Sequence, residues 1–189
     1  NELNKHFCPF FVSLLLLSLL NSIIMNTKFK GNTVQLTGNT IEKGDKAPAF
    51  ELIKRDLSPL SLSELKGKKV VLNIFPSLDT SVCATSVRKF NVLASEMENT
   101  VVLAISKDLP FAHERFCTTE GINNVIALSD FRSPEFGKDY GLLMKDGPLA
   151  GLLARTVVVI DEEGVITYVE VVPEVTQEPD YDGALAAVK

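Results

Sequence analysis

The sequence has no tryptophan, only two histidines and only three cysteines among its 189 residues. It also lacks the CxxC and HExxH motifs, so the common ligand spacings of a protein zinc site are missing. Three cysteines in a chain of this length do not make a disulfide framework. They suit a reducing compartment, or a protein in which a few thiols carry out chemistry. We therefore expect no metal ion and no bound cofactor.

An excess of positive charge is also missing, because the formal net charge is −5 at pH 7. This balance argues against a nucleic-acid-binding protein, which usually presents a basic face. No run of like charges marks a tail, and no internal repeat or low-complexity block divides the chain. The length fits one domain with a full hydrophobic core.

The first 24 residues differ in composition from the rest. No charged residue occurs at positions 7–24, where leucines form a dense apolar block, and Lys5 precedes this block. The pattern is typical of a signal peptide or a short membrane anchor, but no A-x-A cleavage site follows it. We interpret residues 1–24 as an upstream extension outside the fold, with a genuine signal or anchor as the alternative. Residues 25–189 are then a single cytoplasmic domain without membrane contact, or an exported one if the signal is real.

Apolar runs and turn residues predict alternating strands and helices after residue 25. Buried strands are expected at residues 50–53, 70–75, 101–106, 125–128, 156–160 and 165–172, with a tight hairpin at 161–164. Helical segments are expected at residues 61–66, from Cys83 toward Met97, at 110–120 and at 182–188. Pro110 and Gly121 mark the start and end of the third segment, and Asp108 is its possible cap.

A β-hairpin is expected before these elements. Residues 33–37 alternate in polarity, Gly38 and Asn39 provide a turn, and the pattern resumes at Thr40 and Ile41. The order of elements predicts an α/β protein with a mixed central sheet, helices on both faces and an N-terminal β-hairpin. A thioredoxin-like layout, βαβ followed by ββα, fits this order.

The segment from Pro76 to Cys83 points most directly to chemistry. It follows a buried strand and opens a helix, so Cys83 lies in the first helical turn, where unpaired N–H groups and the helix dipole favour a thiolate. The thiolate is the nucleophilic form of cysteine. Thr80 can place a hydroxyl beside the sulfur, and Pro76 ends the strand and helps to force the turn. The alternative is a small, inert cysteine on the core face of the helix.

Residues 75–91, FPSLDTSVCATSVRKFN, closely resemble the active-site segment of bacterial thiol peroxidases, the atypical two-cysteine branch of the peroxiredoxins. The resemblance continues in several separate motifs that occur in the expected order. These are the N-terminal hairpin and residues 44–50, 106–117, 128–132, 140–141 and 153–161. Together they cover nearly all of residues 25–189.

The resemblance implies a role for each matching residue. Cys83 would be the peroxidatic cysteine, with Thr80 and Arg155 as its activating partners and Pro76 as a shield that shapes the loop. Cys117 would be the resolving cysteine, which forms an intramolecular disulfide with Cys83. Hydrogen peroxide and organic hydroperoxides are the implied substrates, thioredoxin the implied reductant and a homodimer the implied working unit. The alternatives are a surface arginine for Arg155 and a core cysteine for Cys117.

Two other functions compete with a peroxidase. A dithiol oxidoreductase or disulfide chaperone would normally carry two close cysteines after the first strand, but the residue three positions after Cys83 is Ser86. A non-enzymatic interaction domain would lack a catalytic group, whereas all five implied residues are present. His113, in the segment that contains Cys117, is expected to be an exposed polar residue rather than a general base. Three acidic residues are expected to be solvated charges or caps: Asp56, Asp130 and Glu135.

Overall fold

The computed structural model of the protein describes residues 25–189. The predictions for residues 1–24, an extension, a signal or an anchor, therefore lie outside the described residues. Within residues 25–189, none of the helices combines the length and the apolar composition needed to cross a bilayer.

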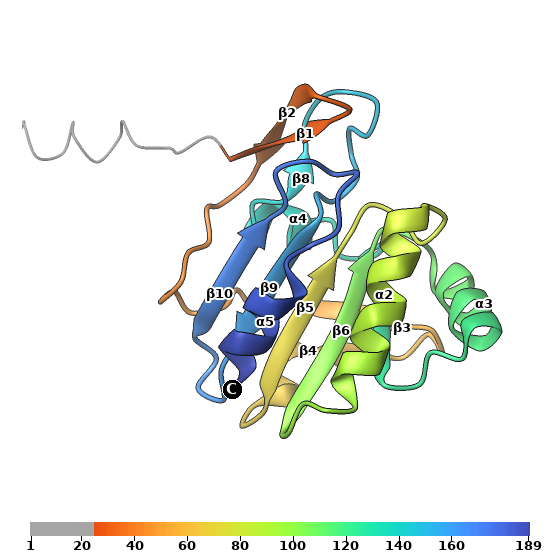
Figure 1. The fold of residues 1–189 in the computed structure, drawn as a ribbon, viewed down its shortest axis with the longest axis vertical. Coiled ribbons are helices and arrows are strands. Elements are labelled where there is room, and N and C mark those ends of the chain that lie inside the picture. The colour runs from red at the N-terminus through yellow and green to blue at the C-terminus, as the bar shows by residue number, and fades with distance from the viewer. Residues whose placement is uncertain (1–24) are drawn as a thin grey trace, which may run out of the picture.

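A seven-stranded mixed sheet forms the centre of the fold (Figure 1). Its strands lie in the order β10-β9-β5-β6-β7-β3-β4. They are β3 (Glu51–Lys54), β4 (Pro59–Ser61), β5 (Lys69–Ile74), β6 (Thr100–Ser106), β7 (Val125–Ser129), β9 (Thr156–Ile160) and β10 (Ile166–Val171). Strands β5, β6 and β7 are parallel, and the remaining pairs are antiparallel. The predicted mixed sheet is confirmed, because each strand expected from an apolar run is present close to its expected position.

Helices cover both faces of this sheet, as predicted. One face carries α2 (Ser81–Ala94), α3 (Pro110–Glu120) and α5 (Tyr181–Val188), and the other carries α4 (Glu135–Asp139) and the 3₁₀ turn η1 (Leu62–Leu65). The alternation of side chains along β6 separates the two cores. Val102 packs in the cluster that contains Cys83 and Cys117, whereas the next residue, Leu103, packs with Phe136 of α4. Both cysteines therefore belong to the face of α2, α3 and α5.

The N-terminal hairpin is present, but its turn lies earlier than predicted. Strands β1 (Asn26–Phe29) and β2 (Asn32–Thr37) pair antiparallel, and Lys30 and Gly31 connect them. Both connecting residues have positive φ angles, 51° and 80°, as a two-residue turn with the twist of a hairpin requires. Strand β2 also pairs with β8 (Leu143–Met144), so the hairpin is one part of a second, three-stranded sheet.

Gly38 and Asn39 are not the hairpin turn, so that prediction is wrong. The Asn39 N–H donates to the carbonyl oxygen of Lys138 at 2.7 Å, which brings the chain against the backbone of α4. A side chain at position 38 would collide with the same carbonyl group. The glycine is therefore required because two backbone segments approach closely. In the sequence, a glycine needed for this reason looks the same as a glycine in a turn.

Helix α3 has the predicted ends but not the predicted cap. Pro110 is its first residue, and Gly121 ends it in the left-handed conformation, with φ at 65°. The N-cap is Leu109 without a side-chain hydrogen bond, so Asp108 does not cap the helix. Helix α2 ends at Ala94, and Met97 lies beyond it.

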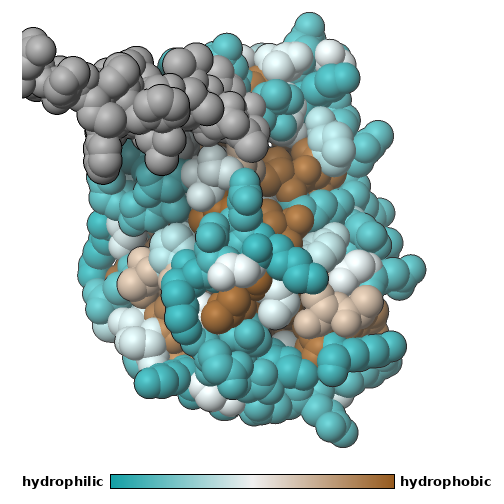
Figure 2. All heavy atoms as spheres, turned by 90° about the vertical axis from the view of Figure 1, so that its left-hand side faces the viewer, coloured by the Kyte–Doolittle hydropathy of each residue, from teal (hydrophilic) through white to brown (hydrophobic). Residues whose placement is uncertain are grey.

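The β10 edge of the main sheet is partly open to solvent. Most residues of β10 are half-buried, in contrast to the fully buried β9 beside it. Viewed from this side, apolar patches are interspersed with hydrophilic side chains (Figure 2). The cysteine-bearing helices α2 and α3 lie toward the opposite side of the molecule (Figure 1).

Candidate active site

Cys83 lies on the strand–turn–helix connection that the sequence predicts. Strand β5 ends at Ile74, and Phe75 makes the next backbone hydrogen bond, from its N–H to the Ile105 carbonyl oxygen at 3.1 Å. The loop then turns at the buried Pro76, which has no N–H to donate. Thr80 is the N-cap of α2, so Cys83 occupies the first helical turn. Its sulfur is held near the positive end of the helix.

Two side chains lie within hydrogen-bonding distance of the sulfur of Cys83, a fully buried residue. The Thr80 hydroxyl lies 2.7 Å from Sγ, and the Arg155 Nη2 lies 3.3 Å from it. The Thr80 hydroxyl also lies 3.1 Å from the carbonyl oxygen of Ser77. Because a hydroxyl has one hydrogen, Thr80 can donate to the carbonyl and accept from a thiol, or donate to a thiolate. The site can therefore hold either form of the sulfur.

Arg155 is fixed in a buried position directly before β9. The residue is 2 % exposed, which rules out a surface arginine. Its Nε and Nη2 donate to the carbonyl oxygen of Val175 at 3.1 and 3.0 Å. Its Nη1 is buried and has no partner among the described residues. The Val175 carbonyl was not predicted, because no side-chain pattern indicates a backbone acceptor.

A cavity of about 390 Å³ adjoins these residues. Thr80, Pro76 and Arg155 line it, and most of the other lining side chains are apolar. The apolar ones are Phe29, Val82, Leu149, Leu152 and Val175. The cavity thus combines an apolar wall with hydrogen-bond donors beside a nucleophilic sulfur.

Cys117 lies on α3 in different surroundings. It is 2 % exposed and is not bonded to Cys83, so the structure describes the dithiol form. Burial raises the pKa of the Cys117 thiol, while the nearby Arg55 lowers it and Glu114 raises it. Arg55 and Glu114 pair with each other at 3.4 Å. The structure therefore brings Thr80, Pro76 and Arg155 together around Cys83, and leaves Cys117 outside this group.

Two polar residues expected at the surface are buried. His113 is fully buried, and burial lowers its pKa from 6.5 to about 4. The expectation of an exposed His113 is wrong because it precedes Cys117 by four residues, so both side chains share the sheet-facing side of α3. That spacing could have predicted its burial. Asp130 is not a solvated charge either, since it is buried and pairs with Lys107 at 2.8 Å.

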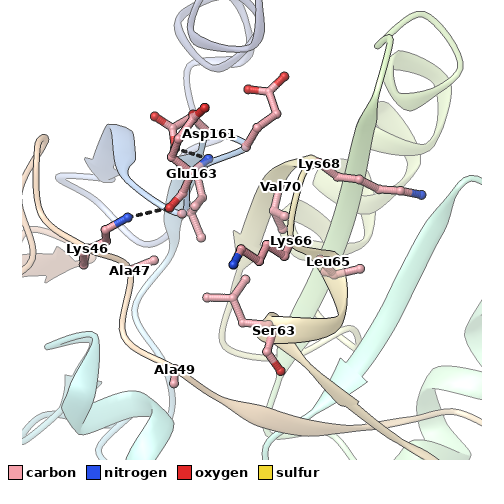
Figure 3. Close-up of a pocket in the computed structure, with 14 residues that line it drawn as sticks. Lys46, Ala47, Ala49, Ser63, Leu65, Lys66, Lys68, Val70, Asp161 and Glu163 are labelled. Atoms are coloured by element: carbon pink, nitrogen blue, oxygen red, sulfur yellow. Dashed lines mark hydrogen bonds between the residues drawn. The ribbon is translucent and has the colours of Figure 1, made fainter.

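A second cavity, of about 250 Å³, lies near the opposite end of β5 (Figure 3). Its wall includes Lys46, Lys66 and Glu163, and the Lys46 amine donates to the Glu163 carbonyl oxygen at 2.6 Å. No cysteine lines it. The Cys83 site and this cavity therefore lie near opposite ends of β5.

Comparison with known proteins gives a consistent result. The Redoxin family model matches residues 42–185. A thiol peroxidase of Corynebacterium glutamicum is 53 % identical over 162 residues, which cover 86 % of this chain and 98 % of the relative. A thiol peroxidase of Mycobacterium tuberculosis is 52 % identical over 159 residues, which cover 84 % of this chain and 95 % of the relative.

The chain belongs to the thiol peroxidase family. It is a thiol-dependent peroxidase with a thioredoxin-like fold, as the sequence motifs predicted. Among solved structures, a peroxiredoxin-like protein from Aquifex aeolicus superposes with a TM-score of 0.83 at 42 % identity. That alignment covers 86 % of this chain and 95 % of the other.

Proposed function

We propose that Cys83 is the peroxidatic cysteine of this peroxidase. The sulfur lone pair attacks a peroxide oxygen, an S–O bond forms and the O–O bond breaks. The electron pair leaves with the distal oxygen, which takes a proton from water, and Cys83 becomes a sulfenic acid. The observation that carries this proposal is the pair of donors, Thr80 and Arg155, on the Cys83 sulfur.

The partners of Cys83 suit this reaction. Arg155 places a fixed positive charge beside the sulfur, where it stabilises a thiolate and the charge that develops on the leaving oxygen. Its unpaired Nη1 leaves one donor free for a peroxide oxygen. Thr80 orients the sulfur, and Pro76 shields it from bulk water. The apolar wall of the cavity accommodates the alkyl part of an organic hydroperoxide as well as hydrogen peroxide.

Cys117 is the proposed resolving cysteine. Its thiol condenses with the Cys83 sulfenic acid, so that an S–S bond forms and one water molecule leaves. A disulfide requires Cα atoms closer than about 7 Å with suitably directed side chains. Since the two thiols are buried on separate helices and have different neighbours, turnover requires local unwinding around one or both.

Thioredoxin is the proposed reductant, and a homodimer the proposed working unit. Both follow from the family. Three large apolar side chains, Leu109, Phe111 and Phe131, are exposed at 51, 66 and 42 %. They follow β6 and β7, whose carboxyl ends are adjacent, so they lie at one edge of the sheet and suit a dimer contact. Cross-linking and sedimentation of the protein, with Phe111→Ser as the comparison, test the dimer.

The proposed compartment is the cytoplasm, where thioredoxin keeps such an enzyme turning over. Residues 25–189 are the proposed functional domain, with residues 1–24 outside it. Mass spectrometry of the mature N-terminus checks both statements. A mature chain that begins near residue 25 in an exported fraction would instead support a cleaved signal.

Peroxide consumption by the Cys83→Ser and Cys117→Ser variants tests the chemistry. Cys83→Ser is expected to abolish peroxidase activity. Cys117→Ser is expected to retain the first burst of sulfenic acid but to lose thioredoxin-dependent turnover. Full activity of Cys83→Ser would falsify the assignment of Cys83, and normal turnover of Cys117→Ser would exclude Cys117 as the resolving residue.

A further inference from the structure

The Asp108 carboxylate holds the loop that leads to Cys83. Asp108 follows β6, and both of its oxygens accept hydrogen bonds. The Ser77 hydroxyl donates to Oδ1 at 2.8 Å, and the Leu78 backbone N–H donates to Oδ2 at 2.7 Å. Ser77 and Leu78 lie between Pro76 and Thr80, which line or contact the peroxide site. Charge-assisted bonds of this kind are about twice as strong as neutral ones.

The same carboxylate reaches helix α3 through Ser106. The Ser106 hydroxyl donates to Asp108 Oδ2 at 2.7 Å and lies 3.1 Å from Nε2 of His113. Because the single hydroxyl hydrogen is given to Asp108, the hydrogen of the second bond must come from the ring nitrogen. Burial lowers the pKa of His113 to about 4 and so favours a neutral ring, which in this arrangement carries its hydrogen on Nε2. Nδ1 is buried and without a partner among the described residues. Asp108, Ser106 and His113 form a chain that ends on the helix that carries Cys117.

We propose that Asp108 is a positioning residue for both half-reactions. Through Ser77 and Leu78 it holds the Cys83 loop in the arrangement that reacts with peroxide. Through Ser106 and His113 it ties that loop to α3, and this chain of bonds has to break before Cys83 and Cys117 can join. The inference rests on the proposed roles of the two cysteines.

Burial distinguishes this connection from another one between the same two segments. Asp79 and Arg115 also link the loop to α3, at 3.1 Å, but their side chains are 72 and 68 % exposed. Exposed ion pairs contribute little to stability because water and salt screen them. The bonds from Ser77 and Leu78 to Asp108 are part-buried and the Ser106–His113 bond is fully buried, so breaking this chain costs more than breaking the exposed ion pair. The chain through Asp108 is thus the connection that resists movement of the loop relative to α3.

The test compares the two half-reactions in Asp108→Asn by quenched-flow mass spectrometry of the full chain. The amide lacks the charge and one acceptor, so the loop is held less firmly. Formation of the Cys83 sulfenic acid is expected to slow roughly tenfold, as for the loss of a charge-assisted hydrogen bond. Formation of the Cys83–Cys117 disulfide is expected to accelerate at least about threefold, since the opposing bonds are weaker. At high peroxide, less Cys83 should then be oxidised to sulfinic acid.

Arg115→Gln is the matched control, and both rates should stay within about twofold of the parent. Ser106→Ala removes the Ser106 bonds to Asp108 and to His113 but keeps the bonds from Ser77 and Leu78 to Asp108. It should accelerate the disulfide step while leaving the sulfenic-acid step nearly unchanged. It also serves as the test if Asp108→Asn does not fold. Equal slowing of both steps, or rates like those of the control, overturns the proposal. Failure of the cysteine assignments is seen separately, as activity that survives Cys83→Ser in the parent.

Discussion

Cys83 and Cys117 pack against the same face of the sheet, yet their surroundings have little in common. As a thiolate, Cys83 accepts hydrogen bonds from Thr80 and from the fixed guanidinium of Arg155. Cys117 is almost equally buried, but burial is the largest influence on it and raises its pKa. At Cys117 burial outweighs the nearby Arg55 and favours the thiol, whereas at Cys83 a buried cation and a hydroxyl lie beside the sulfur and favour a nucleophile.

The difference assigns an order to the chemistry. A thiol that the fold keeps protonated is a poor first nucleophile, because attack requires the thiolate. It is well suited to react second, after movement has exposed it to water and to the oxidised partner. If the proposed roles hold, the folded form is arranged for reaction with peroxide, and disulfide formation belongs to a rearranged form.

Arg155→Met should have the largest effect, because it turns the surroundings of Cys83 into those of Cys117. The variant keeps most of the side-chain volume but loses the donor to Sγ. Sulfenic-acid formation is expected to slow about a hundredfold to a thousandfold, the cost of removing one donor at a developing charge. Single-turnover mass spectrometry measures this rate, and circular dichroism checks the fold. Arg88→Met, at an exposed arginine of α2 that pairs with Glu120, is the control and should keep the parent rate.

His113→Gln tests whether water is excluded from the face of α3 that carries Cys117. Burial lowers the His113 pKa to about 4 in the folded protein, against 6.5 when unfolded. Between these values the unfolded chain binds a proton that the folded protein does not, so stability is complete above pH 6.5 and falls as the pH is lowered. The free energy of unfolding should fall by about 3 kcal/mol more in the parent than in the variant over this window.

Urea denaturation at a series of pH values measures this difference. Asp130, whose pKa is raised by burial, acts in the opposite direction, but it is common to both proteins and cancels in the comparison. Parallel stability curves for parent and variant would show that the imidazole is hydrated, and that α3 is less tightly packed than its burial indicates.

His113 also shows where sequence patterns stop being informative. The long buried strands and the ends of α3 were predictable, because apolar runs, Pro110 and Gly121 act locally. Cys83, Thr80 and Pro76 share one contiguous motif, so they could be placed together. The link from Asp108 to His113 was not predicted, because a polar residue has the same appearance in the sequence whether its partner is water or a distant side chain.

Short elements were missed for a related reason. Strands β4 and β8 and helix α4 contain too few residues to show a period, and they exist because of the neighbours they pair with. The Gly38 prediction failed for the opposite reason. The residue has a strong local turn signal, but glycine is needed there because the backbone of Lys138 approaches closely. Tertiary contacts decided both cases.

Thr80→Val should have a smaller effect than Arg155→Met. The substitution replaces the hydroxyl with a methyl group of similar size, so Cys83 loses one neutral donor and keeps the cation. The rate of sulfenic-acid formation is expected to fall about tenfold. Thr80→Ser retains the hydroxyl and should restore most of the rate, which separates the hydrogen bond from packing. Equal rates for the valine and serine variants would show that the hydroxyl does not act on the sulfur.

Arg55→Gln should have the smallest effect, and it examines the Cys117 side of the comparison. Arg55 lowers the pKa of Cys117, but burial outweighs it and Glu114 opposes it. Its side chain is 42 % exposed, so solvent screens its charge. The variant should therefore raise the pKa of Cys117 slightly further, without a change in the rate of sulfenic-acid formation at Cys83. Ultraviolet titration of the thiolate measures the shift in a background where Cys83 and the third cysteine of the sequence, Cys8, are both replaced by serine. Arg88→Gln is the control. A shift as large as the one that burial causes would mean that Arg55 activates Cys117 as Arg155 is proposed to activate Cys83, and the contrast between the two sites would disappear.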